Sequence, residues 1–148
     1  MTASRPSPPT PAQVARFATD LRVACQRISR RVRFESTHEV APHQFSVLIR
    51  LEDAPRTPGE LAEIERVAKP SMTRTVAALV ERGLVSRQDD PSDGRQVILS
   101  LTVEGRALVR QIRRRRDAWM SSRIAALPAD EQEVLARATA ILMRVASE

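Results

Sequence analysis

Between Thr57 and Leu101 the sequence changes from a helical period to a strand period, and no other feature constrains the fold as strongly. The segment opens with Thr57-Pro58-Gly59-Glu60, which has the pattern of a capping box. In this motif the threonine hydroxyl accepts from the amide three residues on, and the glutamate side chain reaches back to the threonine amide. A short helix is therefore expected after Thr57, with Pro58 in its first position, where a missing N–H costs nothing.

A second helix is expected after a break near residues 67–69. Pro70 opens it, it runs over residues 71–82, and Gly83 occupies the position after its end, where glycine is favoured. Two helices joined by a turn of about four residues have the spacing of a helix-turn-helix.

The residues after Gly83 alternate as strands do. Strands are expected over 84–87 and 96–101, separated by the polar turn segment 89–95. A β-hairpin directly after a helix-turn-helix makes a winged helix. We therefore expect a mostly α fold with a small β-hairpin, in which the winged-helix lobe covers about residues 42–101.

Further helical periods flank this lobe. Helices are expected over about 12–34, from Pro42 to before Pro55, from the cap Thr102 to about Leu127, and over 129–145. The proline-rich residues 1–11 are expected to be a disordered arm, and 12–148 a single protomer. The first and last helices carry apolar stripes too long for such a small lobe to cover. We therefore expect 12–34 and 102–147 to form a dimerisation domain.

Composition excludes several classes of protein. The 148 residues suffice for one domain, and the chain has no apolar run of the roughly 18–20 residues that a membrane span needs. The N-terminus lacks the apolar stretch of a secretion signal, so a cytoplasmic location is expected. One cysteine, two histidines and four glycines leave few residues for a disulfide framework, a zinc site or acid–base catalysis. We expect no enzyme, no cofactor and no metal.

The charge of the chain favours a polyanionic partner. Lysine and arginine number 24 against 18 acidic residues, a formal net charge of +6. Such an excess is typical of proteins that bind nucleic acid.

Double-stranded DNA is the partner that the second helix of the pair favours. The apolar side of this helix would pack on the core, and small residues on the opposite side would let the helix enter a major groove. There Arg74 can pair with guanine, and neighbouring hydroxyls can reach phosphates or base edges. Lys69 and the helix N-terminus add phosphate contacts. At the hairpin tip Arg95, oriented by Asp93, can enter a minor groove. The expected DNA-binding residues are Lys69, Pro70, Ser71, Thr73, Arg74, Thr75, Arg87, Asp93 and Arg95.

The run KPSMTRTVAALVERGLVSR, followed by DPSDGRQVILSLTVEG, resembles the recognition helix and wing of the MarR (multiple antibiotic resistance) family of bacterial regulators. The matching features are Asp93 and Arg95, the Leu101-Thr102-x-x-Gly105 segment, and the turn from Arg82 to Val85. The resemblance covers roughly residues 12–146. It implies a DNA-binding repressor that is an obligate homodimer, with an effector site between its dimerisation and DNA-binding parts. Such a dimer presents two recognition helices about one DNA turn apart and requires a pseudo-palindromic operator.

The chain departs from the family pattern before the recognition helix. Ala68 and Glu65 stand where serine and leucine are frequent, so we expect Ile64 to take over the core position.

The effector implied by the resemblance would be a small aromatic or anionic ligand. Four consecutive arginines, 113–116, point all round a helix, and most are expected to be solvated or paired with Asp117 or glutamates elsewhere. One of them, together with Arg30 or Arg31 of the first helix, can hold an anion. The candidate ligand-binding residues are therefore Arg30, Arg31 and Arg113. Trp119 is expected in the dimer core.

Three alternatives remain open. Cys25 is expected to be a small buried hydrophobe. It can instead make the protein a redox sensor, as in the organic-hydroperoxide branch of the family. That branch pairs its cysteine with tyrosines, and this chain has none. Zinc binding by His38 and His43, with Cys25 or Glu39, lacks a spaced ligand set. A winged helix used for protein–protein contact would favour acidic residues on the exposed helix face, where this chain has Ser71, Arg74 and Ala78.

Overall fold

The computed structural model describes residues 8–34, 39–89, 91 and 96–147. Its elements are, in chain order, α1 (Pro11–Phe34), α2 (Pro42–Asp53), α3 (Pro58–Ile64), α4 (Lys69–Glu81), β1 (Val85–Asp89), β2 (Val97–Leu101), α5 (Val103–Ala125) and α6 (Ala129–Ser147). The expected mostly α fold with one hairpin is confirmed. The predictions for the arm before Pro8, for His38, and for Asp93 and Arg95 at the hairpin tip lie outside the described residues.

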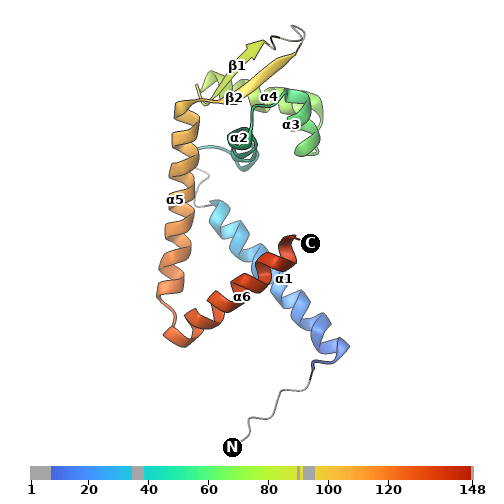
Figure 1. Ribbon diagram of the computed structural model, residues 1–148, viewed down its shortest axis with the longest axis vertical. Coiled ribbons are helices and arrows are strands. Elements are labelled where there is room, and N and C mark those ends of the chain that lie inside the picture. The colour runs from blue at the N-terminus through green and yellow to red at the C-terminus, as the bar shows by residue number, and fades with distance from the viewer. Residues whose placement is uncertain (1–7, 35–38, 90, 92–95, 148) are drawn as a thin grey trace, which may run out of the picture.

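One end of the molecule is a lobe built from α2, α3, α4 and the hairpin (Figure 1). β1 and β2 pair antiparallel, with Val85 opposite Leu101 and Asp89 opposite Val97. Arg56, just before α3, adds a short bridge to Leu99. The start of α5 closes the core of this lobe. Its largest fully buried side chains are Val47, Leu48, Leu61, Leu79, Leu99, Val109 and Ile112.

The helix ends follow the local signals in the sequence. The Thr57 hydroxyl accepts from the Glu60 amide at 3.2 Å, and the Thr57 amide donates to Glu60 Oε2 at 2.7 Å, so the capping box is confirmed. Gly83 follows the end of α4 with φ of 69°, a backbone conformation that few residues other than glycine adopt. Several boundaries differ from prediction: α4 covers Lys69–Glu81 rather than 71–82, β1 covers Val85–Asp89 rather than 84–87, and β2 begins at Val97 rather than at residue 96.

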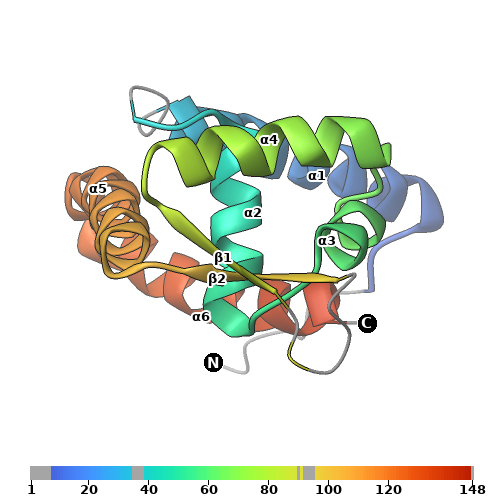
Figure 2. The ribbon, with the colours of Figure 1, turned by 90° about the horizontal axis from the view of Figure 1, so that it is seen from above.

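The other end of the molecule consists of three long helices. α5 leads away from the lobe, and α1 and α6 cross in projection to the right of its lower half (Figure 1), but the view from above separates them (Figure 2). No described residue of α1 or α6 is fully buried. The uncovered apolar side chains on these two helices are Val14, Phe17, Ile28, Phe34, Val134, Leu135, Ile141, Met143 and Val145. The predicted apolar stripes are thus present, and one chain alone does not cover them.

Two predictions about burial are wrong for the single chain. Cys25 is exposed rather than buried, because nothing in the described chain packs over that face of α1. Ile64 remains 38% exposed, because Leu61 and Ala62 already occupy the contact between α3 and the core. No helix in the described part of the chain is long and apolar enough to cross a membrane.

Candidate nucleic-acid interface

Helix α4 lies with one side in the core and one side open. Met72, Val76 and Leu79 are buried and fix it to the lobe. The opposite side exposes Lys69, Pro70, Thr73, Arg74 and Ala77, while Ser71, Thr75 and Ala78 are half-buried. The predicted division of this helix into a packed and a free side is confirmed.

The two threonines on α4 use their hydroxyl protons within the helix. Thr73 Oγ1 donates to the Lys69 carbonyl at 3.0 Å, and Thr75 Oγ1 donates to the Ser71 carbonyl at 3.1 Å. A hydroxyl carries one proton, and a phosphate oxygen accepts but does not donate. In this conformation the threonines can therefore accept from base amino groups but cannot donate to phosphates, which narrows the role that the sequence predicts for them.

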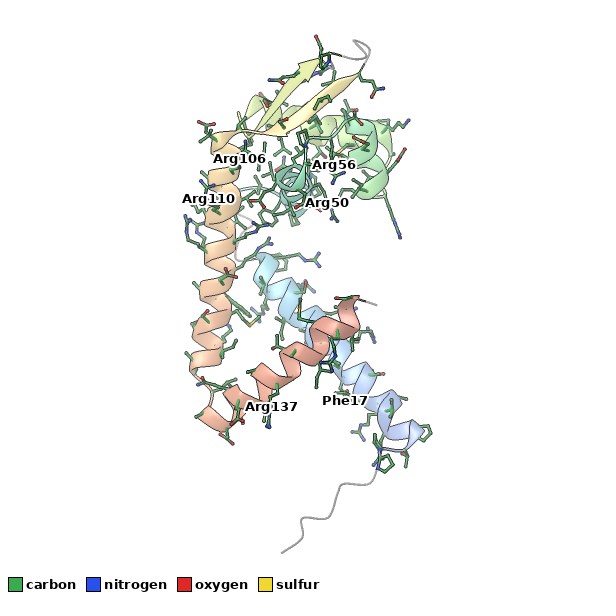
Figure 3. All side chains as sticks on the ribbon, in the orientation of Figure 1. Phe17, Arg50, Arg56, Arg106, Arg110 and Arg137 are labelled. Carbon is green, nitrogen blue, oxygen red and sulfur yellow. The ribbon has the colours of Figure 1, made fainter. Side chains whose placement is uncertain are left out.

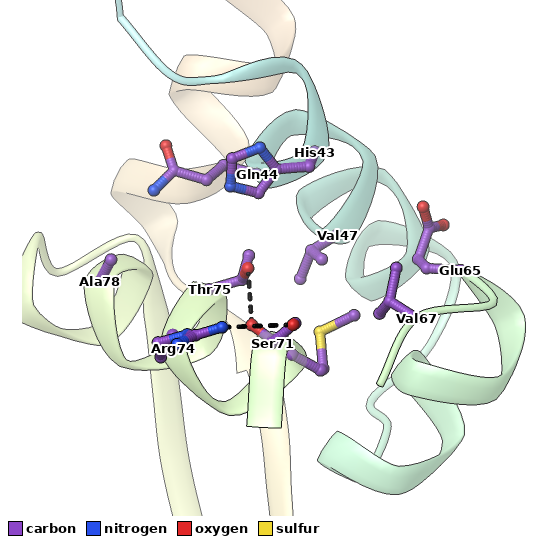
Figure 4. Close-up of a pocket in the computed structure, with 10 residues that line it drawn as sticks. His43, Gln44, Val47, Glu65, Val67, Ser71, Arg74, Thr75 and Ala78 are labelled. Atoms are coloured by element: carbon purple, nitrogen blue, oxygen red, sulfur yellow. Dashed lines mark hydrogen bonds between the residues drawn. The ribbon is translucent and has the colours of Figure 1, made fainter. Parts of the chain in front are cut away.

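The Arg74 side chain is exposed and weakly held. Its Nη2 donates to Ser71 Oγ at 3.4 Å, close to the limit of a hydrogen bond. Figure 4 shows the two residues beside a pocket of about 410 Å³, which separates α4 from the start of α2, where His43 and Gln44 lie. The guanidinium can swing away from Ser71 at little cost in free energy.

A second hollow, of about 700 Å³, lies on the other side of α4. Thr73 and Ala77 line it from α4, Gly59 from α3, and Arg87 and Gln96 from the hairpin. The structure therefore brings Arg87 to the same surface as Thr73, as the predicted site requires. α4 thus lies between two hollows, with Arg74 lining the first and Lys69 exposed at the start of the helix.

Glu65, which the sequence did not single out as a site residue, holds the helix-turn-helix in place. Its Oε2 accepts from Ser46 Oγ at 2.6 Å, and its Oε1 accepts from Arg50 Nε at 2.9 Å, both on α2. Burial raises the pKa of Glu65, but the hydrogen bonds from Ser46 and Arg50 outweigh burial and leave that pKa below its usual value. The carboxylate thus ties the turn after α3 to α2.

The arginine run on α5 also joins elements. Arg113 pairs with Glu52 at 2.7 Å, and Arg115 pairs with Glu39 at 2.8 Å. The Arg116 guanidinium lies 4.1 Å from the centre of the Phe45 ring. Burial, and then the nearby Arg33 charge, lower the pKa of Arg116. The predicted pairing of this run with distant glutamates is confirmed.

The candidate effector residues lie in different surroundings. Arg30 and Arg31 line a pocket of about 580 Å³ along α1, and Arg113 is not among its lining residues. The Arg30 guanidinium lies 5.6 Å from the Phe34 ring centre. Trp119 is half-buried, with Arg123 stacked at 3.6 Å from its ring. Within the described residues no group of three or more His, Cys, Asp or Glu side chains is placed to hold a metal ion.

Comparison with known proteins agrees with this geometry. The model of the MarR family matches residues 38–96. The HTH-type transcriptional regulator Mb0904 of Mycobacterium bovis is 40% identical, over 90% of this chain and 95% of its own length. A crystal structure of a transcriptional regulator from Pseudomonas aeruginosa is 32% identical with a TM-score of 0.77, covering 95% of this chain and 99% of that one. Apo MarR of Escherichia coli is 27% identical with a TM-score of 0.72, covering 86% and 94%.

Proposed function

Because the chain belongs to the MarR family of winged helix-turn-helix transcriptional regulators, we propose that it represses transcription by binding a pseudo-palindromic operator as a homodimer. One observation carries the proposal: α4 lies between two hollows, with Lys69 and Arg74 exposed on it. The hollows leave room for the two DNA strands that border a major groove when the helix enters it.

Each residue of the interface has a role that its surroundings support. Arg74, held by one long hydrogen bond, turns to guanine O6 and N7, and Thr73 accepts from an amino group on a base edge. Lys69 and Arg87, both exposed, neutralise phosphates on the two sides of α4. Asp93 and Arg95 remain proposed minor-groove contacts at the hairpin tip.

The dimer follows from the uncovered faces of α1 and α6. Phe17 is 66% exposed and Met143 is 64% exposed, on helices that have no fully buried described residue. Large apolar stripes on terminal helices are stable in water when a second copy covers them.

We further propose that a small aromatic or anionic ligand relieves repression. Arg30, Arg31 and the Phe34 ring line a pocket with cationic and aromatic walls. Arg113 can join such a site only when it leaves Glu52.

Redox sensing through Cys25 is the second candidate: its thiol is exposed in the single chain, and this mechanism requires that the dimer leave that part of α1 uncovered. Cys25 lines a pocket of about 610 Å³ together with Arg30 and Arg33. If peroxide releases DNA from the wild type but not from Cys25→Ser, the redox mechanism replaces the ligand mechanism. We expect both proteins to keep their DNA affinity.

Salt titration tests the function. Duplexes are first selected from the source genome by pull-down with the protein, and the affinity of one selected duplex is then measured over a range of salt. With about six phosphate contacts the slope of log K against log salt should be near −5. Arg137→Ala, on α6 and far from α4 (Figure 3), removes one charge and should leave the slope unchanged. A slope near zero, or equal affinity for random DNA, would refute DNA binding as the function.

A further inference from the structure

Glu39 lies just before α2 and contacts two elements that are distant in sequence. Its Oε1 accepts from Gln111 Nε2 and from Arg115 Nη1 on α5, both at 2.8 Å. Its main-chain carbonyl accepts from Arg82 Nη2 at 2.6 Å. Arg82 is the C-cap residue of α4, directly after Glu81. Glu39 therefore connects the end of the recognition helix to the middle of the long helix.

Part of the Glu39 carboxylate is unfavourably placed in this position. Its second oxygen, Oε2, is buried and has no hydrogen-bond partner among the described residues. A buried acceptor without a partner is unfavourable by about 1–3 kcal/mol. The side chain is thus held where it joins α5, although one of its oxygens is poorly satisfied there.

The end of α4 has another attachment to α5, at the first turn of that helix. Thr102 Oγ1 donates to the Gly83 carbonyl at 2.7 Å, and the Thr102 amide donates to the Leu84 carbonyl at 3.2 Å. Gln111 and Arg115 lie about 14 and 20 Å further along α5, at a rise of 1.5 Å per residue. Val109 and Ile112 already pack this part of α5 into the core, and the Glu39 contacts beside them add a polar joint that restricts the remaining tilt of α5 against the end of α4.

We propose that Glu39 is a positioning residue that sets the angle between α4 and α5, and thereby the half-site spacing that the dimer accepts. The inference rests on the proposed function. α5 leads from the lobe towards the helices that form the dimer (Figure 1). A change of angle in each lobe is therefore carried, through the two-fold axis, into the separation of the two recognition helices.

The Arg113–Glu52 ion pair provides the matched control. It also joins α5 to the lobe, at 2.7 Å, and Glu52 is as half-buried as Glu39. Glu52 belongs to α2, and none of its described contacts reaches α4. Its loss should lower stability in the same way as loss of the Glu39 contacts, without altering the position of α4.

The test compares wild type, Glu39→Gln, Gln111→Leu and the control Glu52→Gln. Affinity is measured for the selected operator and for duplexes with one base pair added or removed between the half-sites, a shift of about 3.4 Å and a tenth of a turn. Wild type and Glu52→Gln should prefer the native spacing equally. Glu39→Gln and Gln111→Leu should lose about fivefold of that preference. If both keep the wild-type preference while folded, the inference is wrong.

A second measurement needs no DNA. A spin label at Ala77, exposed on α4, is introduced by Ala77→Cys in a Cys25→Ser background, and the distance between the two labels of the dimer is measured by double electron–electron resonance. Glu39→Gln should broaden the distance distribution, and Glu52→Gln should not. An unchanged distribution in Glu39→Gln overturns the inference. If wild-type protein binds no duplex selectively, the proposed function is overturned. The distance measurement still decides the role of Glu39 in that case. If Glu39→Gln fails to fold, Gln111→Leu decides both measurements.

Discussion

The hydroxyl of Thr102 donates a 2.7 Å hydrogen bond to the carbonyl oxygen of Gly83, so the residue that caps α5 also holds the end of the recognition helix. The same hydroxyl accepts from the Gly105 amide at 3.0 Å. A Cβ at Gly105 would lie 2.2 Å from the Leu84 carbonyl oxygen. These contacts explain why the turn from Arg82 to Val85 and the segment from Leu101 to Gly105 occur together in the sequence. Each segment supplies a part of the contact that joins the end of α4 to the start of α5.

Gly105→Ala should destabilise the fold strongly. The new methyl group meets the main-chain oxygen of Leu84, which cannot move without shifting the start of β1. Overpacking of this kind costs about 1–3 kcal/mol or more. Chemical denaturation measures the loss, with Gly59→Ala as the control, because a Cβ there meets only Thr57 Oγ1 at 3.7 Å. Equal stability of the two variants would show that the joint is not tightly packed.

Acid should weaken the start of α3 through Glu60. Its pKa lies below the usual 4.5, first because the Thr57 amide donates to the carboxylate and then because the Thr57 hydroxyl does so. A group whose folded pKa is lowered stabilises the fold above its ordinary pKa, and this contribution is lost as pH falls through the folded pKa.

Glu60→Gln should therefore lower the melting temperature near pH 7. Below pH 4.5 the melting temperature of this variant should decrease less with falling pH than that of wild type. Glu63→Gln, an exposed carboxylate on the same helix, is the control. If the melting temperatures of wild type and Glu60→Gln change with pH in the same way over this range, the assigned role of the capping box is contradicted. Thr57→Ala should cost about 0.5–2 kcal/mol at neutral pH.

Phe17→Glu should convert the dimer to a folded monomer. Phe17 is 66% exposed in the single chain, and a carboxylate placed there would be buried without a partner when two copies associate. Light scattering after gel filtration reports the mass, and circular dichroism reports the fold. Val103→Glu is the control, since Val103 is 73% exposed but lies on α5 beside the lobe. A dimeric Phe17→Glu protein would place the interface elsewhere.

Local signals in the sequence predicted the parts of the fold that local chemistry decides. The capping box at Thr57, the positive φ at Gly83 and the cap at Thr102 each depend on residues within a few positions. The free side of α4 followed from its helical period in the same way.

Contacts between distant residues could not be predicted from such signals. Glu65 accepts from Ser46, 19 residues away, and Glu39 accepts from Gln111, 72 residues away. The exposure of Cys25 depends on whether another segment covers α1, which its own helical period does not report. The prediction of a core position for Ile64 is wrong for a related reason. Leu61 and Ala62 are the residues of α3 that pack on the core, and the helical period does not distinguish them from Ile64.

We propose that α4 reads DNA bases through Arg74. Binding-site selection from a random duplex library, followed by sequencing, compares wild type with Arg74→Ala and with the control Arg137→Ala. Wild type and Arg137→Ala should select the same pseudo-palindrome. Arg74→Ala should lose about 1–3 kcal/mol of affinity and its preference at one guanine in each half-site, with the other positions retained. Selection of the same guanine by Arg74→Ala as by wild type would contradict the account.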